Sequence, residues 1–584
     1  MHAIRRSVRW LFIVLLGFGI FFAFIGIRTL HRAAWIPTVR GGTWWPADAV
    51  FVLEIPRLSH FFTSLTTTAS MQEILHRPEI AHHWRTYQRQ RQMHMLRSLP
   101  ASVRDVLRRW IRHPALQRVE RLGFAVWLHR RPTSCPSDPR LLEWAFVTEA
   151  PSEAHSVLRT VLSVWWTQIA RALHRSESPR VYTENTLLWV TSLRGWRDLQ
   201  DVRAGQRTAL QTRPIARRWE KMVDSNGFYA LFDIAALHTC GWLPSASLGG
   251  SVDAVLYHWV RRGNWLDTTV IWVPPSDRPT PWQRLVYTRR TPHDFARWVD
   301  IRDGIVLYLH LPADFRRSAW MQRVRRALTA APLQDWIRHW NGRALLAVDL
   351  SPLWRELPGL IPEDTAASPW RALGRGLELV REIRLFLMIG AQDVASWKDA
   401  WWQSVRTLET RSLWWTLRER TDLPIPAYEL SLLITPGIRP VFGLYDNHLI
   451  LAWNDVQLTE RWQGNRARMI QQVEQQWRTL DTYGSDKWFL FAYMNGPTTL
   501  ALDQWKAWWL WDTPDAKPSA WTSIWQELLT AAAQWKGRLS KAWCTSEACT
   551  LQSRTDVVIV EPLPLVWLEA THWLVQLTRK PQPR

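Results

Sequence analysis

Glycine is scarce in this chain, with 25 in 584 residues. A loop that cradles a phosphate needs glycines, because their backbone can approach the ligand closely, and no such loop is found. The motifs Gly-x-Ser-x-Gly, His-Glu-x-x-His and Cys-x-x-Cys-His are also missing. We therefore predict no catalytic residues, no cofactor and no metal. An envelope hydrolase is the weaker alternative, because two carboxylates from distant segments can form a site.

Clustered metal ligands are lacking as well. The stretch from His76 to His94 contains four histidines, but the adjacent His82 and His83 point to different faces of a helix. A metal site needs ligands that converge in space. We interpret these histidines as surface residues of a polar helix.

Only four cysteines are present. Cys544 and Cys549 bracket the residues TSEA, and the segments on both sides have the pattern of strands. A four-residue loop between two strands brings the flanking residues opposite each other, at a separation that a disulfide can bridge. We predict a disulfide between Cys544 and Cys549, with two reduced buried thiols as the alternative. Nothing in the sequence indicates whether Cys135 and Cys240 pair.

Lysine is nearly missing, since eight lysines stand beside 65 arginines. The formal net charge is nevertheless +22, and the chain contains 43 tryptophans. Arginine and tryptophan together suit cation–π contacts and pairing with phosphate or carboxylate groups. A compositional bias that raises both residues along the whole chain explains the same numbers, and the two interpretations stay open.

One basic segment has the pattern of an amphipathic helix. In ASVRDVLRRWIRH, residues 101–113, the apolar side chains recur at helical spacing and Asp105 is the only acid. The polar face could rest against anionic lipid or a negatively charged envelope polymer. A solvated surface helix is the alternative. The candidate contact residues are Arg104, Arg108, Arg109 and Arg112.

Tryptophans recur in adjacent pairs. Exposed pairs could stack on sugar rings, and the protein would then be a binding module for an envelope glycan or lipid. Trp505, Trp508 and Trp509 share one helical face, however, which is typical of a buried core stripe. We therefore favour burial. The pairs are Trp165-Trp166, Trp401-Trp402, Trp414-Trp415 and Trp508-Trp509.

Charged residues are missing between Trp10 and Ile27. Eighteen residues at a rise of 1.5 Å give a helix of about 27 Å, near the thickness of a bilayer's hydrocarbon core. The residues that follow make a poor cleavage site, so a cleaved signal peptide is the weaker alternative. We predict a cytoplasmic tail over 1–9, a transmembrane anchor over 10–27 and a linker over 28–44.

The arginines on the two sides of this anchor nearly balance, so charge does not decide its orientation. A short N-terminal tail before a very long C-terminal portion favours an inside N-terminus. We therefore predict a single-pass protein of the bacterial cytoplasmic (inner) membrane whose bulk is periplasmic or extracellular. Nucleic acid is a poor partner for an exported protein, despite the positive charge.

Strands that end at an acid occur several times. AVFVLEIPRL, FYALFDIAALH and RALLAVDLSPLW place Glu54, Asp233 and Asp349 where an apolar run turns into a helical pattern. A carboxylate there can accept backbone N–H groups of the helix's first turn. His310 and Asn495 occupy similar places at the ends of later strands. The residue at this position is therefore polar in each copy but not always acidic. We interpret these acids as structural.

Two hairpins share one pattern, VYTENTLLWVTS and GLYDNHLILAWN. Each has Asn in a tight turn, where Asn tolerates φ > 0, and Ser192 and Asn454 follow where a helix N-cap belongs. Other segments match in order, such as LGFAVWLHRR with IRLFLMIGA and GFYALFDI with KWFLFAYM. These strands, interleaved with helical patterns, predict an α+β fold of mostly antiparallel sheet with packed amphipathic helices.

The matching segments predict two tandem repeats. The extra strand GIVLYLHLPADF lies between them and could instead open the second repeat. We expect a first α+β repeat over 45–275, a connector over 276–340, a second α+β repeat over 341–562 and a C-terminal tail over 563–584.

The layout resembles a bacterial family of uncharacterised, membrane-anchored exported proteins, known only as a domain of unknown function. The resemblance is carried by the lone anchor, by the strand opening WPADAVFVLEIPRL, and by the tight turns at Glu184-Asn185 and Asp446-Asn447. It implies repeated α+β units and supplies no catalytic residues.

Together these features predict a membrane-anchored extracytoplasmic protein without catalytic activity. We expect a scaffold or accessory subunit of an envelope complex, with a protein partner and with its own N-terminal helix in the membrane. The alternative is a Trp/Arg-rich module that binds an envelope glycan or an anionic lipid.

Overall fold

The computed structural model describes fourteen stretches of the chain together with a few isolated positions between them. The stretches are 45–99, 119–129, 141–172, 175–213, 227–239, 252–274, 304–311, 339–360, 382–393, 415–432, 439–463, 489–502, 519–545 and 548–558.

The described strands form one sheet of eighteen strands. They are β1 (Ala49–Ile55), β2 (Arg121–Leu128), β3 (Leu142–Glu149), β4 (Arg180–Glu184), β5 (Leu187–Thr191), β6 (Gly227–Asp233), β7 (Ala254–Arg262), β8 (Trp265–Val273), β9 (Ile305–His310), β10 (Trp340–Asp349), β11 (Arg384–Ala391), β12 (Trp415–Arg420), β13 (Ala427–Leu432), β14 (Val441–Tyr445), β15 (His448–Ala452), β16 (Leu490–Met494), β17 (Arg538–Cys544) and β18 (Cys549–Thr555).

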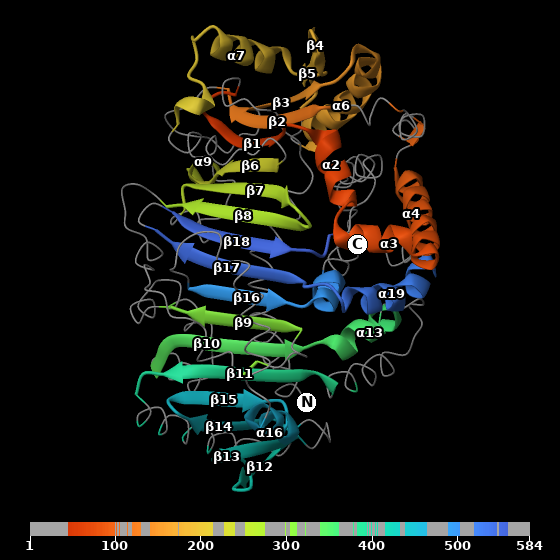
Figure 1. Cartoon of the computed structure of the whole chain (residues 1–584). Coiled ribbons are helices and arrows are strands. Elements are labelled where there is room, and N and C mark those ends of the chain that lie inside the picture. The colour runs from red at the N-terminus through yellow and green to blue at the C-terminus, as the bar shows by residue number, and fades with distance from the viewer. Residues whose placement is uncertain are drawn as a thin grey trace.

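Every pairing between these strands is antiparallel, which confirms the predicted α+β class with a mostly antiparallel sheet. The pairings give the order β4-β5-β3-β2-β1-β6-β7-β8-β18-β17-β16-β9-β10-β11-β15-β14-β13-β12, which can be followed from top to bottom in Figure 1. The strand that the sequence placed in a connector, β9, therefore lies inside the sheet between β16 and β10.

The predicted tail 1–9, anchor 10–27, linker 28–44 and C-terminal tail 563–584 lie outside the described residues. Among the described helices, none combines the length and the apolarity that crossing a bilayer requires.

Nine α-helices of the described stretches connect or flank the strands. They are α2 (Leu58–Thr66), α3 (Ala69–His76), α4 (Pro78–Ser98), α6 (Ser152–Ala172), α7 (Leu193–Arg203), α9 (Ile234–Thr239), α13 (Ser351–Leu360), α16 (Asp455–Gln463) and α19 (Ser519–Ala532).

Both hairpin turns have the backbone that the sequence predicts. Asn185 has φ 54°, and Asp446 and Asn447 have φ 45° and 63°, all in the left-handed region that a tight two-residue turn requires. The predicted caps are confirmed as well, because Ser192 Oγ accepts the N–H of Gly195 at 2.8 Å and Asn454 Oδ1 accepts that of Gln457 at 2.7 Å.

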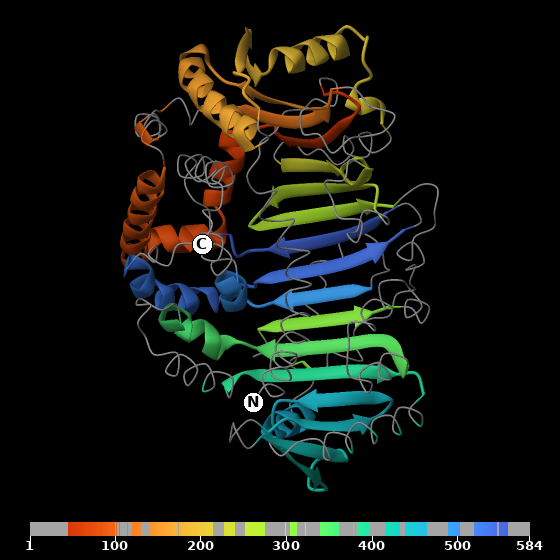
Figure 2. The same cartoon turned by 180° about the vertical axis from the view of Figure 1, so that it is seen from behind.

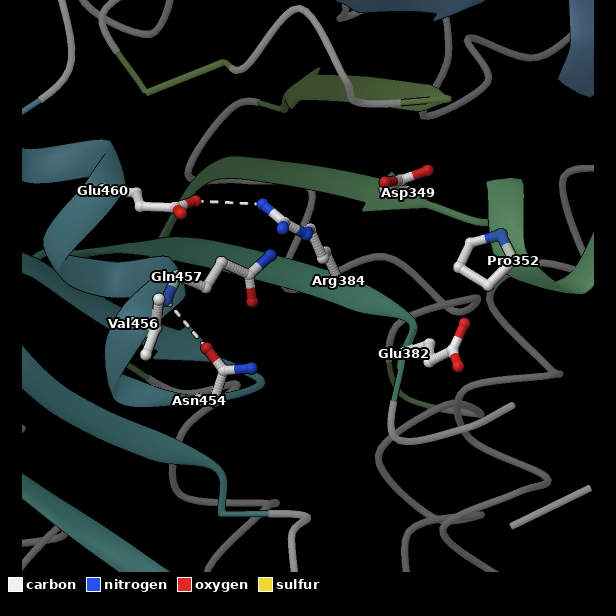
Figure 3. Close-up of a pocket in the computed structure, with 8 residues that line it drawn as sticks. All are labelled: Asp349, Pro352, Glu382, Arg384, Asn454, Val456, Gln457 and Glu460. Atoms are coloured by element: carbon white, nitrogen blue, oxygen red, sulfur yellow. Dashed lines mark hydrogen bonds and ion pairs between the residues drawn. The ribbon is translucent and has the colours of Figure 1, made fainter. Parts of the chain in front are cut away.

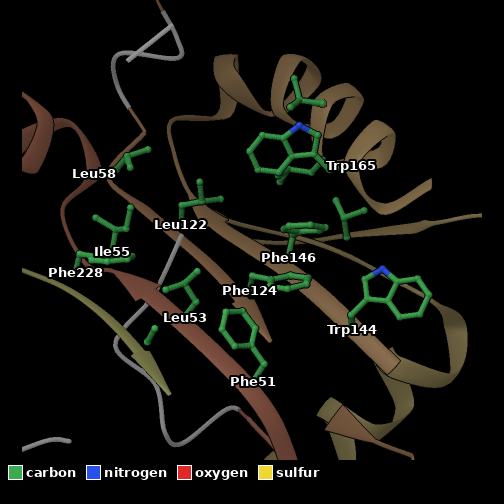
Figure 4. Packing of buried hydrophobic residues seen from close by; sticks show 14 of the residues in the cluster. Phe51, Leu53, Ile55, Leu58, Leu122, Phe124, Trp144, Phe146, Trp165 and Phe228 are labelled. Atoms are coloured by element: carbon green, nitrogen blue, oxygen red, sulfur yellow. The ribbon is translucent and has the colours of Figure 1, made fainter. Parts of the chain in front are cut away.

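Strand alternation divides the sheet into two apolar faces. On the first, which we name the α6 face, Phe51, Phe124 and Phe146 lie beneath α6, as Figure 4 shows. The rings of Phe124 and Phe146 stack at 4.6 Å, and Trp165 of α6 meets Phe146 edge-on at 5.8 Å. The opposite face, which we name the α7 face, packs against α7 near one end of the sheet and against α16 near the other.

A second core lies among helices from distant parts of the chain. Ile80, Trp84 and Tyr87 of α4 pack with Trp525 and Leu528 of α19. Figures 1 and 2 show these helices as a layer beside the middle of the sheet, with α4 at the rim of the molecule. This helical layer joins the N-terminal and C-terminal parts of the described chain independently of the sheet.

Candidate functional site

A hollow of about 370 Å³ lies where β10 and β11 meet the starts of α13 and α16 (Figure 3). Its lining comes from both strands and both helices, and the contribution of α13 is Pro352. The lining residues are Asp349, Pro352, Glu382, Arg384, Asn454, Val456, Gln457 and Glu460.

Structural contacts hold most of these polar groups. Arg384 Nη1 donates to Glu460 at 2.9 Å, and Asp349 Oδ1 accepts the N–H of Ser351 at 2.9 Å. Asn454 and Gln457 form a reciprocal cap, because the Gln457 side chain in turn accepts the N–H of Trp453 at 3.0 Å. Carboxylates beside helix N-termini stabilise the positive ends of the helix dipoles. The hollow can therefore hold a small polar group, but its side chains are arranged to cap helices.

The three strand-end acids each have their own structural partner. Trp45 Nε1 donates to Glu54 at 3.0 Å, and Asp233 accepts the N–H of Ala236 at 2.8 Å. Asp349 accepts a backbone N–H in the same way as Asp233. Asp233 and Asp349 thus act as helix-start acceptors, which confirms the structural interpretation for them, and Glu54 satisfies a buried indole.

A polar band crosses the α7 face at the middle of the sheet. His258, Thr269, Gln552 and Lys541 lie directly opposite one another across β7, β8, β18 and β17, so they share one face. His258, Gln552 and Lys541 are 6%, 8% and 5% exposed. Buried polar groups are costly unless they are paired, so this band is unusual within a sheet core.

An ion pair adjoins the band on the same face, two residues farther along β8 and β18. Arg554 Nε donates to Asp267 Oδ1 at 2.7 Å and Nη2 to Oδ2 at 3.0 Å, which makes a bidentate pair between β18 and β8. Both residues are buried, at 8% and 3% exposure. We name these six residues the central polar band: His258, Asp267, Thr269, Lys541, Gln552 and Arg554.

The central polar band separates two apolar clusters on the α7 face. Val52, Leu231 and Leu256 belong to one cluster, and Tyr308 and Phe491 belong to the other. The band therefore specifies how β8 meets β18, because a shift of one residue would move Asp267 to the opposite face from Arg554. Sequence reasoning missed it. The only signal was a polar residue at an inward position of four separate strands.

The predicted disulfide partners face each other at the turn of the hairpin, where Cys544 ends β17 and Cys549 begins β18. Cys544 and Cys549 are joined by a disulfide and are both buried among apolar side chains. Cys135 and Cys240 lie outside the described residues.

Of the predicted basic contact residues, the described part of the chain includes only Arg104, whose Nη2 donates to the carbonyl of Leu99 at 3.3 Å. Arg108, Arg109 and Arg112 lie outside it. The predicted contact surface therefore stays a prediction.

Trp165 and Trp166 are 3% and 0% exposed, which confirms burial for this pair. Trp401, Trp402, Trp414, Trp508 and Trp509 lie outside the described residues. The rings of His82 and His83 touch edge to face at 5.6 Å. Within the described ranges, no group of three or more potential ligand side chains converges as a metal site would require.

No protein-family model matches the chain, and comparisons with curated proteins and with solved structures also give no match. The resemblance to the family of exported proteins therefore stays a hypothesis.

Proposed function

We propose that the chain is a membrane-anchored extracytoplasmic scaffold or accessory subunit of a bacterial envelope complex, without catalytic activity. The observation that carries this proposal is the continuous sheet of eighteen antiparallel strands. At a spacing of about 4.8 Å between strands, such a sheet is on the order of 80 Å across. A platform of that size offers partners a long surface.

The buried charges of the described part support a structural role. Glu143 is 0% exposed and accepts hydrogen bonds from Arg175 at 3.1 Å and from Arg194 at 2.5 Å. Arg207 joins Asp198 at 2.7 Å and Asp48 at 2.6 Å. A catalytic carboxylate needs a free side facing substrate, and these carboxylates are already engaged within the fold.

We also propose that the chain consists of two tandem α+β repeats joined at β8 and β18. Outward from this seam, one side runs β7, β6, β1, β2, β3 and the hairpin β5–β4. The other side runs β17, β16, β9, β10, β11 and the hairpin β15–β14, with β13 and β12 added at its end. These positions favour β9 as the opening strand of the second repeat.

The strand positions also favour a different internal correspondence from the one that sequence similarity indicates. β2 corresponds by position to β10 and β3 to β11, whereas the sequence matched LGFAVWLHRR of β2 with IRLFLMIGA of β11. The hairpin β4–β5 corresponds to the hairpin β14–β15, and β6 corresponds to β16, both by position in the sheet and by sequence pattern. We therefore propose that the second repeat begins near Gly304.

The glycan-binding alternative depends on exposed tryptophan. Within the described part, the large apolar side chains with high exposure are Leu75, Met93, Leu193 and Val456. Since none of these is tryptophan, no observation favours a sugar-stacking platform there.

Affinity purification of the full chain from mild detergent tests the scaffold proposal. We expect a protein partner in a fixed ratio, identified by mass spectrometry of the eluate. A homogeneous monomer that carries nothing with it, from cells grown under several conditions, would contradict the proposal.

A further inference from the structure

Helix α4 has one buried and one exposed side. Ile80, Trp84 and Tyr87 are 2%, 2% and 3% exposed and face the core that α4 shares with α19. The outer side carries the exposed residues Arg85, Arg89, Met93 and Arg97, spaced four positions apart. Residues at this spacing are neighbours on a helix surface, so the four form one stripe, which we name the α4 stripe.

The α4 stripe is about 18 Å long, because its ends are twelve residues apart at 1.5 Å each. Figures 1 and 2 show α4 at the rim of the molecule, on the far side of the helical layer from the sheet. The stripe is therefore accessible to a flat surface as far as the described elements are concerned.

The charge of the α4 stripe is unbalanced. The sequence has no acid between Glu79 and Asp105. Arg85, Arg89 and Arg97 make no side-chain hydrogen bond or ion pair with another residue that the structure describes. Many arginines elsewhere in the described part are paired, including Arg207 with Asp198 and Arg554 with Asp267. Three guanidiniums on one side of α4, without a partner among the described residues, are thus available to an external anion.

An apolar side chain lies within this basic row. Met93 is 44% exposed, among the most exposed large apolar residues of the described chain. A helix that combines arginine with an exposed apolar side chain suits the boundary between lipid headgroups and acyl chains. An acidic protein groove would attract the arginines equally but gives no particular reason for an exposed methionine.

We propose that the α4 stripe rests on the anionic headgroups of the bilayer to which the chain is anchored. This inference rests on the proposed membrane anchorage. The guanidiniums pair with lipid phosphates, for which their planar geometry is suited, and Met93 enters the headgroup layer. Each basic residue near an anionic surface strengthens binding about fivefold, so the three arginines together contribute on the order of 100-fold.

The test places the full chain in lipid nanodiscs, either of neutral phosphatidylcholine or with added phosphatidylglycerol. Met93→Cys carries a fluorescent label, and lipids with a spin-labelled chain serve as quencher. Labelling of the unsubstituted protein measures the background from Cys135 and Cys240. We expect quenching only in the discs that contain phosphatidylglycerol, and its loss in high salt because exposed charges are screened.

The matched variants remove equal charge from two places. Arg85→Gln, Arg89→Gln and Arg97→Gln, combined, should abolish the quenching. Arg57, Arg159 and Arg171 are also exposed and make no ion pair within the described stretches, so their combined change to Gln should leave the quenching unchanged. Circular dichroism and thermal unfolding confirm that both triple variants fold.

Other results would overturn the inference in distinguishable ways. Equal quenching in neutral discs would show that charge is not the cause. A chain that is incorporated into the discs but never quenched would reject the stripe and leave the anchorage intact. Protection of the label by a bound acidic protein would assign the α4 stripe to that partner. A chain recovered outside the discs would reject the anchorage together with this inference.

Discussion

At the scale of single residues, the pair Asp267–Arg554 is a buried, bidentate contact between two strands that are far apart in the sequence. It crosses the seam between β8 and β18, and its two hydrogen bonds are 2.7 and 3.0 Å long. Burial makes an isolated charge costly, because removal of one partner leaves the other uncompensated. The value of the pair therefore lies less in net stability than in the register that it imposes on the seam.

We predict that Asp267→Ala lowers the free energy of unfolding by about 3–5 kcal/mol. The double variant with Arg554→Met should recover most of this loss, since no buried charge remains. Urea unfolding followed by tryptophan fluorescence measures both. Arg77→Ala, which removes the exposed pair with Glu73, is the control and should cost no more than about 1 kcal/mol.

Tyr257 gives a prediction for alkaline pH. Burial raises the pKa of its phenol far above the usual value, although the hydrogen bond from Trp259 and the charge of Arg538 lower it. The folded pKa is thus above the unfolded one, so this contribution to stability is complete below about pH 10 and declines above it.

In the variant Tyr257→Phe, the fall in stability between pH 9 and pH 11 should be shallower than in the unsubstituted protein. At pH 8 the variant should be less stable by about 1 kcal/mol, because Trp259 Nε1 loses the acceptor that it has at 2.6 Å. Urea midpoints across this pH range measure both effects. An unchanged slope would mean that Tyr257 ionises in the folded protein.

At the scale of elements, local patterns predicted local structure well. Asn185, Asp446 and Asn447 adopt the positive φ that their turns require, and Ser192 and Asn454 cap the helices that follow. These features depend on a few neighbouring residues, which the sequence shows directly. Alternating apolar residues likewise predicted strands, because alternation reports how many faces of a strand are buried.

The disulfide is a prediction at this scale. Mass analysis of the protein recovered from the cell envelope under non-reducing conditions should find the peptides of Cys544 and Cys549 linked. Reduction should cost at most about 2 kcal/mol, because the bond closes a very short loop within an already paired hairpin. Free thiols at both positions in that preparation would refute the crosslink.

At the scale of the whole molecule, the sequence predicted the fold class but not the order of the strands in the sheet. Periodicity tells which side of β9 is apolar but not that β9 lies between β16 and β10, since strand partners come from distant segments. The central polar band could not be found for the same reason. His258 and Lys541 are far apart in the sequence and meet only through the pairing of β8 with β18.

The helical layer adds a second connection that the sequence did not indicate. Trp535 Nε1 donates to Glu73 at 2.6 Å, and Ser70 Oγ accepts the N–H of Val558 at 2.9 Å. These contacts join segments at opposite ends of the described chain. The two proposed repeats are thus joined both through the sheet and through this layer, as a scaffold of fixed shape requires.

The proposed function depends above all on which side of the membrane the bulk of the chain occupies. A reporter fused after Arg584 that is active only outside the cytoplasm measures this most directly. We predict activity from that reporter and none from a matched reporter that works only in the cytoplasm. Activity of the cytoplasmic reporter alone would contradict the account, because the envelope role, the lipid contact of α4 and an oxidised Cys544–Cys549 pair all require export.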